Sequence, residues 1–206
     1  MPLQRKGFRA YTDGLFMKTI EFENRFGLRH LSTLAFQDFE TEKQVKDKCE
    51  KTLKRKDYQT ENRWHTSLFQ REIEREVEIP FEIKEVHPLV GYGVFAIKKI
   101  PFLTFLGEYT GLIRKRNRRI DKSNDYVFGY SIGPKDTKWV IDASKQGNFT
   151  RFINHSDEPN LTSTWIVLEG LSHIIFFANR LILPGEQLTY DYGPYYWRKR
   201  AAPLEL

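Results

Sequence analysis

Side chains of types found in enzyme active sites gather in two short segments of the C-terminal half. Residues 151–160 read Arg-Phe-Ile-Asn-His-Ser-Asp-Glu-Pro-Asn, and residues 188–193 read Leu-Thr-Tyr-Asp-Tyr-Gly. Further upstream, a glycine pair opens the segment GYGVFA at residues 91–96. Each signal alone has an ordinary structural explanation, because a tyrosine often packs with its hydroxyl in water and a glycine pair often marks a turn with positive φ. Their occurrence together and in this order is the informative feature.

In that order, the segments resemble the signature motifs of the SET-domain protein lysine methyltransferases. The resemblance runs from about residue 79 to residue 193 and is carried by GYGVFA at 91–96, GEYTG at 107–111, DYVF at 125–128, VIDA at 140–143, RFINHSDEPN at 151–160, IIFFA at 174–178, PGE at 184–186 and LTYDYG at 188–193. It implies a mainly β fold with some α, built from several small β-sheets. It also implies a knot-like C-terminal crossing of the last two motifs beside an S-adenosylmethionine site.

Lysine methylation requires a neutral amine that attacks the methyl group of a sulfonium ion. Lysine has an ordinary pKa near 10.4, so only about one lysine in a few thousand is neutral at pH 7. A narrow aromatic channel would dehydrate the amine, and the nearby sulfonium charge would lower its pKa. The resemblance places Tyr109 and Tyr126 in this channel and Tyr192 beside the transferring methyl group. Since a phenol is mostly protonated at neutral pH, we expect Tyr192 to orient and stabilise rather than to act as a general base.

The resemblance also implies a product switch and a set of cofactor contacts. Tyr190 occupies the switch position, where tyrosine is associated with mono- or dimethylation. The residues expected to hold S-adenosylmethionine are Gly91, Tyr92, Gly93, Tyr126, Arg151, Asn154, His155, Tyr192 and Trp197. For the side chains of Asn154 and His155, a second reading is that they satisfy polar groups of the buried crossing.

No metal site is expected. The single cysteine, Cys49, excludes both a disulfide framework and a cysteine-rich zinc cluster, and Asp157 stands where the family motif usually has cysteine. A lid over the site must therefore be built without zinc. Its natural candidates are Tyr195, Tyr196 and Trp197, with an ordinary surface-packed aromatic cluster as the alternative.

The particular forms of the motifs in this chain suggest a subfamily. The combination of NHSD, GEYTG and a DYGPxYW end resembles the SET proteins of Chlamydia-type intracellular bacteria. This implies a histone or bacterial histone-like protein as substrate, in the bacterial cytoplasm or in a host nucleus reached by secretion.

Hydrophobic periodicity divides the chain into three parts. Residues 1–78 are basic and helical in pattern, with Val45, Cys49 and Leu53 four residues apart, and Trp64 and Leu68 repeating the spacing after a polar break near residues 58–62. From Ile79 the period becomes two, which marks the start of a β-rich domain over 79–193; residues 194–206 form the aromatic and basic tail. Strands are predicted at 79–83, 93–98, 104–109, 126–131, 138–142, 162–168 and 173–178.

The charge is basic and local. A net charge of +6 and a pI near 9.3 favour acidic partners such as DNA. The candidate nucleic-acid patch comprises Arg114, Lys115, Arg116, Arg118, Arg119, Arg198, Lys199 and Arg200, with a merely solvated face as the alternative. No apolar run approaches 18 residues and the N-terminus lacks a signal-peptide pattern, so we expect a soluble intracellular protein without membrane contact. The oligomeric state is not indicated.

Two classes of function follow. The leading hypothesis is an adenosylmethionine-dependent protein lysine methyltransferase, acting on histone-type or, in a variant reading, non-histone proteins. The rival is a chromatin- or nucleic-acid-binding protein whose fold has lost catalysis. Retention of Tyr192, Asn154, His155 and the glycine pair favours the enzyme, because a binding module does not need the full set.

Overall fold

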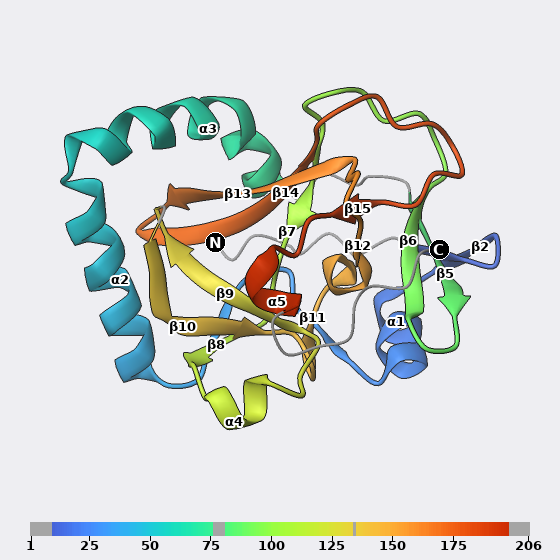
Figure 1. The fold of residues 1–206 in the computed structure, drawn as a ribbon, viewed down its shortest axis with the longest axis horizontal. Helices are drawn as coiled ribbons and strands as arrows, with labels where there is room; N and C mark the ends of the chain where they lie inside the picture. The colour runs from blue at the N-terminus through green and yellow to red at the C-terminus, as the bar shows by residue number, and fades with distance from the viewer. Residues whose placement is uncertain (1–9, 76–80, 134, 198–206) are drawn as a thin grey trace.

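The computed structural model describes residues 10–75, 81–133 and 135–197, which form small β-sheets with helices around them (Figure 1). This mainly β architecture with some α confirms the predicted fold class. All six strands predicted between residues 93 and 178 are present, within three residues at each end. The strand predicted from Ile79 is observed from Phe81, and Ile79 itself lies outside the described residues.

The first sheet has the order β2-β1-β5-β6. Its strands are β1 (Ala10–Thr12), β2 (Leu15–Met17), β5 (Phe81–His87) and β6 (Gly91–Ala96). Tyr11 of β1 pairs in parallel with Glu82 of β5. The N-terminal segment therefore contributes strands to the sheets, whereas its pattern predicted only helices.

Two further sheets and two strand pairs complete the β structure among the described residues. The second sheet, β4-β8-β10-β9, contains β4 (Ala35–Phe36), β8 (Leu112–Lys115), β10 (Lys135–Asp142) and β9 (Val127–Ile132). The third sheet, β13-β14-β7, contains β13 (Leu161–Leu168), β14 (Leu171–Ala178) and β7 (Phe105–Glu108). The pairs are β11 (Gln146–Gly147) with β3 (Arg29–His30), and β12 (Asn154–His155) with β15 (Thr189–Tyr190).

Helices α2 (Phe39–Leu53) and α3 (Lys56–Arg75) run around one side of the sheets (Figure 1). The Asp38 carboxylate caps α2 by accepting a hydrogen bond from the Thr41 N–H at 2.7 Å. Val45 and Cys49 are fully buried, as their spacing predicted. The remaining helices are α1 (Thr19–Phe26), α4 (Arg118–Asp121), α5 (Pro194–Trp197) and the 3₁₀ helix η1 (Phe149–Phe152).

The buried face of α3 differs from the prediction. Trp64 is 55% exposed and Leu68 is 36% exposed, whereas Tyr58 and Phe69 are buried. The side chain of Asn62 accepts from the Val167 N–H at 2.6 Å and donates to the Val167 carbonyl at 3.1 Å. These bonds satisfy the backbone of β13, an edge strand, and so fix which face of α3 points inward.

The break between the two helices also differs from the prediction. It lies at residues 54–55 rather than near residues 58–62. Residues 58–62 lie inside α3. A helix accommodates polar side chains, so their polarity alone does not mark a helix end. Among the described residues, no helix combines the length and hydropathy needed to span a membrane.

Candidate active site

The crossing of the two C-terminal segments forms the centre of the site. Strand β12 pairs in parallel with β15, placing Asn154 opposite Thr189 and His155 opposite Tyr190. On the other side of the same segment, the Leu188 N–H donates to the Val94 carbonyl of β6 at 2.7 Å. The segment that leads to Tyr192 is thus held between two other parts of the chain.

His155 fixes the backbone that follows the crossing. Its Nδ1 accepts a hydrogen bond from the Tyr192 N–H at 3.2 Å, which assigns the ring hydrogen to Nε2. Nε2 lies 3.3 Å from the Asp157 carboxylate, and the His155 side chain is only 6% exposed. Both ring nitrogens therefore face groups of the chain itself, so the side chain serves the crossing.

Tyr192 lies in a cluster of aromatic rings. Its ring centroid is 4.7 Å from that of Tyr190, 4.6 Å from that of Tyr196 and 6.1 Å from that of Trp197, the last nearly parallel. Its hydroxyl donates to the Ile153 carbonyl at 2.9 Å. Burial raises the pKa of Tyr192 well above the ordinary value, so the phenol stays protonated at neutral pH.

Tyr109 and Tyr190 line the same cluster from the sheets. The Tyr109 hydroxyl donates to the Tyr126 carbonyl at 3.0 Å, and burial raises its pKa. Tyr190 stacks on Phe128 at 6.0 Å and approaches Phe176 to 4.8 Å. Burial also raises the pKa of Tyr190.

Sequence reasoning did not assign Phe128 and Phe176 to the site. Tyr109 packs against Phe128 at 5.0 Å and against Phe176 at 6.3 Å, so these rings connect the tyrosines into one wall. Both belong to segments singled out as motifs, which is the signal that could have identified them.

Arg151 lies against Tyr126. The Arg151 guanidinium carbon is 3.5 Å from the Tyr126 ring centroid, and its Nη1 donates to the Ser144 carbonyl at 3.3 Å. This cation–π contact fixes the ring of Tyr126, whose backbone carbonyl accepts from the Tyr109 hydroxyl. The Nε of Arg151 is buried without a hydrogen-bond partner among the described residues.

The glycine pair is joined to the crossing by Asn154. Its side-chain nitrogen donates to the Tyr92 carbonyl at 3.1 Å and to the Gln187 side-chain oxygen at 3.0 Å. Gly91 has φ +82°, and a Cβ on Gly93 would lie 2.3 Å from that Gln187 oxygen. That Cβ would also lie 2.6 Å from Val86 Cγ2, so Gly93 favours the close approach of the segments, and Gln187 is a site residue that no sequence signal identified. The Tyr92 ring packs 4.9 Å from Phe26 rather than on the tyrosine cluster.

Helix α5 brings two of the three lid candidates onto the cluster. The Trp197 ring is 4.8 Å from His155 and 4.8 Å from Tyr196. The indole Nε1 is buried without a hydrogen-bond partner in the described part of the chain. The side chain of Tyr195 lies outside what the structure describes, as do Arg198, Lys199 and Arg200.

Arg114 differs from the other predicted patch residues. Its guanidinium contacts the Asp121 carboxylate at 2.6 Å and the Asp142 carboxylate at 2.8 Å, and only 13% of its side chain is exposed. Because its charge is used inside the protein, we remove Arg114 from the patch. Lys115, Arg116, Arg118 and Arg119 are exposed.

Comparisons with known proteins bear on the family of the chain. Residues 91–193, half of the chain, match the family model described as SET domain. The human protein "Histone-lysine N-methyltransferase 2B" is 43% identical over 106 residues, which cover 50% of this chain and 4% of that protein.

Two solved structures resemble the chain over somewhat longer stretches. The "Crystal structure of Arabidopsis thaliana SUVH6 in complex with SAM, form 1" matches with a TM-score of 0.52 and 28% identity, covering 61% of this chain and 30% of that one. The "crystal structure of KRYPTONITE in complex with mCHH DNA, H3(1-15) peptide and SAH" matches with a TM-score of 0.50 and 31% identity, covering 62% and 26%. The chain thus spans only a small part of the relatives it matches.

Proposed function

Because the chain belongs to the SET-domain family, we propose that it is an S-adenosylmethionine-dependent protein lysine N-methyltransferase acting on histone or histone-like basic proteins. One observation carries the proposal. The hydroxyls of Tyr109 and Tyr192 both donate to backbone carbonyls, within one aromatic cluster. Since a phenol has one hydrogen, each oxygen then offers only lone pairs to a ligand. Such oxygens suit an ammonium or a sulfonium ion.

The aromatic wall would prepare the substrate lysine. An amine enclosed by Tyr109, Phe128 and Tyr190 loses water, which disfavours its charged form and lowers its pKa. The faces of the same rings also attract a methylated ammonium, the product of each transfer. The wall therefore supports both deprotonation of the substrate and retention of a partly methylated intermediate.

Tyr192 would orient the reaction rather than take up a proton. Its pKa is raised by burial, so it cannot act as a general base at neutral pH. Its hydroxyl is fixed by Ile153 and its backbone by His155. A fixed oxygen that is already in place stabilises developing charge without reorganisation.

The residues present fit S-adenosylmethionine, a donor that supplies an electrophilic methyl group on a positively charged sulfur. The buried Trp197 Nε1 is an unused donor beside Tyr192, and the aromatic rings around it favour a cation. Gly91, Tyr92, Gly93, Tyr126, Arg151, Asn154, His155, Tyr192 and Trp197 remain the proposed contact set. The side chains of Asn154 and His155 already bond within the chain, so we assign them to positioning the backbone.

Two finer statements belong to the proposal. Tyr190 would favour mono- or dimethylation, because its hydroxyl leaves less room for an already methylated amine to turn. The bacterial origin and the intracellular location rest on motif variants and composition alone, while the relative and the plant structure described above come from eukaryotes.

Incubation with labelled S-adenosylmethionine and a panel of histones and bacterial histone-like proteins tests the activity. We expect label on lysine of at least one basic protein, detected by mass spectrometry, and about 100-fold less label with Tyr192→Phe over the same time. A folded protein that binds S-adenosylmethionine yet labels no lysine in any panel member would favour the rival, a chromatin- or nucleic-acid-binding protein without catalysis.

A further inference from the structure

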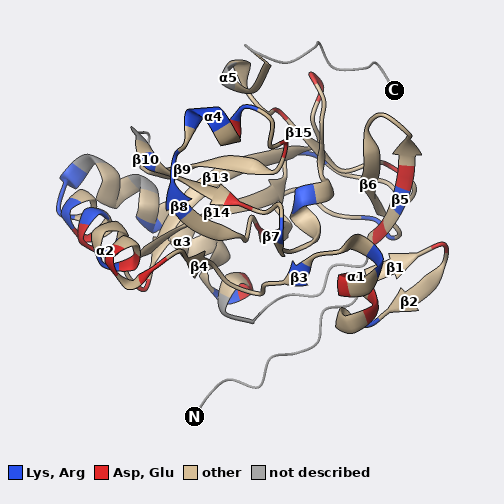
Figure 2. Cartoon of the chain, turned by 90° about the horizontal axis from the view of Figure 1, so that it is seen from below, with Lys and Arg blue, Asp and Glu red and all other residues tan. Residues whose placement is uncertain are grey.

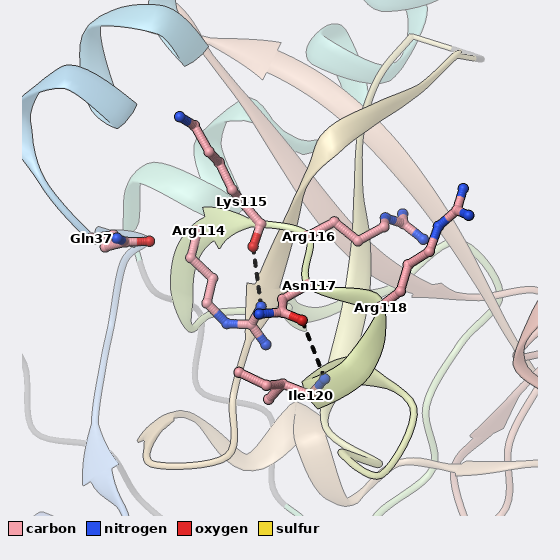
Figure 3. Close-up of a pocket in the computed structure, with 7 residues that line it drawn as sticks. All are labelled: Gln37, Arg114, Lys115, Arg116, Asn117, Arg118 and Ile120. Carbon is pink, nitrogen blue, oxygen red and sulfur yellow. Dashed lines mark hydrogen bonds between the residues drawn. The ribbon is translucent and has the colours of Figure 1, made fainter.

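Four exposed cations lie together beside α4, and three of them, Lys115, Arg116 and Arg118, line an open pocket. Lys115, Arg116, Arg118 and Arg119, which we call the basic loop surface, follow one another at the end of β8 and the start of α4. Figure 3 shows the pocket, of about 550 Å³, with Lys115, Arg116 and Arg118 extending from its rim while Arg114 points inward. Figure 2 shows α4 as a basic segment on one edge of the molecule.

The neighbouring carboxylates do not neutralise this surface. Asp142 bonds to Arg114, to the Asn124 side chain at 3.0 Å and to the Ser144 N–H at 3.0 Å. Asp121 bonds to Arg114 and accepts from the Asn117 N–H at 2.8 Å. Asp38 lies near enough to Lys115 for that charge to contribute to lowering the Asp38 pKa, after its hydrogen bonds with Thr41, but within the described residues no ion pair within 4 Å involves any of the four cations. Their charge is therefore available to a ligand.

Helix α2 offers an instructive contrast. It also carries many lysines, but acidic residues alternate with them and pair with them, as Glu42 does with Lys46 and Glu50 with the C-cap residue Lys54. Exposed i,i+4 pairs of this kind partly cancel their own field. A surface whose cations are unpaired attracts polyanions more strongly than a surface with the same number of cations paired to carboxylates.

From this arrangement we infer that the basic loop surface binds the sugar-phosphate backbone of duplex DNA. Three of the four cations are arginines. A planar guanidinium group can donate two parallel hydrogen bonds to the oxygens of one phosphate. A cationic surface repels a basic protein substrate and attracts the nucleic acid that accompanies it. The inference goes beyond methyl transfer and is measured without it.

The same loop is connected to the candidate active site. Asn124 donates to Asp142 and accepts from the Tyr126 N–H at 3.0 Å. The buried ion pairs of Arg114 thus fix both the base of the basic loop surface and the segment that carries Tyr126. DNA bound here would lie near the segment that carries Tyr126, which suits a substrate that is itself bound to DNA.

DNA binding is tested on the full chain, without S-adenosylmethionine, by fluorescence anisotropy with a labelled duplex over a salt series. The test variant carries Gln in place of Lys115, Arg116, Arg118 and Arg119. The control variant carries Gln in place of Lys43, Lys46, Lys48 and Lys51 of α2, so both lose the same net charge. If each of the four cations contacts one phosphate, the slope of log affinity against log salt should fall by about 3 to 4 in the test variant.

The controls make the outcome decisive. We expect the control variant to keep nearly the wild-type slope and a triple variant with Arg116, Arg118 and Arg119 changed to Lys to keep most of it, while circular dichroism shows all variants folded. An unchanged slope in the test variant, or equal losses in test and control variants, would overturn the inference. Tighter binding to anionic lipid vesicles than to DNA would also overturn it.

Discussion

The proposed mechanism depends most on the hydroxyl group of Tyr192. The substitution Tyr192→Phe removes this group and keeps the ring. The ring should stay in place, because Tyr190, Tyr196 and Trp197 contact it on several sides. His155 holds the backbone N–H of residue 192, which the substitution does not change. The variant therefore separates the role of the oxygen from that of the ring.

The expected effects on stability and on turnover differ in size. Loss of the hydrogen bond to Ile153 should destabilise the fold by about 1 kcal/mol, which lowers Tm by about 2 to 4 °C in a chain of this length. Loss of one fixed electrostatic group should reduce the methyl-transfer rate by about 100-fold or more, equivalent to about 2.7 kcal/mol of barrier. The barrier effect therefore exceeds the stability effect by more than twofold.

Single-turnover methylation of a lysine peptide with labelled S-adenosylmethionine measures the rate. Tyr130→Phe is the matched control, since the Tyr130 hydroxyl is buried, accepts from the Ser172 N–H at 3.1 Å and lies on the side of the core that faces Cys49. We expect the control to lose comparable stability with little change in rate. A folded Tyr192→Phe protein that methylates at the wild-type rate would refute the mechanism.

Three other outcomes follow from the structure. Tyr190→Phe should shift products toward trimethyl-lysine with little loss of the first step, as read by mass spectrometry of a single-lysine peptide at exhaustive reaction; trimethylation by the wild type would contradict this. Burial opposes protonation of His173, but the Glu108 carboxylate 2.8 Å away outweighs it and raises the pKa of His173. The stability from this pair is fully present below the unfolded-state pKa of about 6.5 and is lost as pH rises through the folded-state pKa. The free energy of urea unfolding of the wild type minus that of His173→Gln should therefore decrease as pH rises, and an increase with pH would contradict the pairing. Gly93→Ala places a Cβ 2.3 Å from the Gln187 oxygen and should cost about 1 to 3 kcal/mol and weaken S-adenosylmethionine binding, checked by thermal unfolding and calorimetry; wild-type values for both would show that the site yields easily.

Period-two alternation predicted the longer strands because it depends only on adjacent residues. It missed β3 and β4, since a strand of two residues has no period and its partner is far away in sequence. Strand β4 pairs with β8, and β3 with β11, across more than 70 residues in each case. Strand β4 adds to the edge of a sheet, and β3 forms a separate two-stranded pair with β11, so each depends on a distant partner that the sequence of the short segment does not specify.

The helix error has a similar origin. Trp64 and Leu68 are more apolar than Asn62, so a local pattern places them inside. The structure buries Asn62 because two bonds to Val167 satisfy both its polar atoms and an edge strand. These two hydrogen bonds, to a residue 105 positions away, outweigh the cost of burying the Asn62 side chain.

The arginines at 114–119 also show what sequence alone cannot predict. In the sequence, Arg114 and Arg116 are equivalent members of one cluster of cations. In the structure, Arg114 lies between Asp121 and Asp142, whereas Arg116 is exposed. Only the pairing of β8 with β10 brings Asp142 to Arg114, so charge counting overestimates the patch by one residue.

The polarity of the candidate site also depends on tertiary contacts that no motif specifies. A tyrosine can donate or accept, and the sequence leaves both roles open. Because Ile153 and the Tyr126 carbonyl take the hydroxyl hydrogens, Tyr192 and Tyr109 are left as acceptors toward a ligand. Acceptors on an aromatic wall select cations over carboxylates, and burial keeps both phenols from ionising. Under the proposed function, these oxygens and rings would hold the lysine ammonium and the sulfonium of S-adenosylmethionine, and the ammonium would lose a proton to water before methyl transfer.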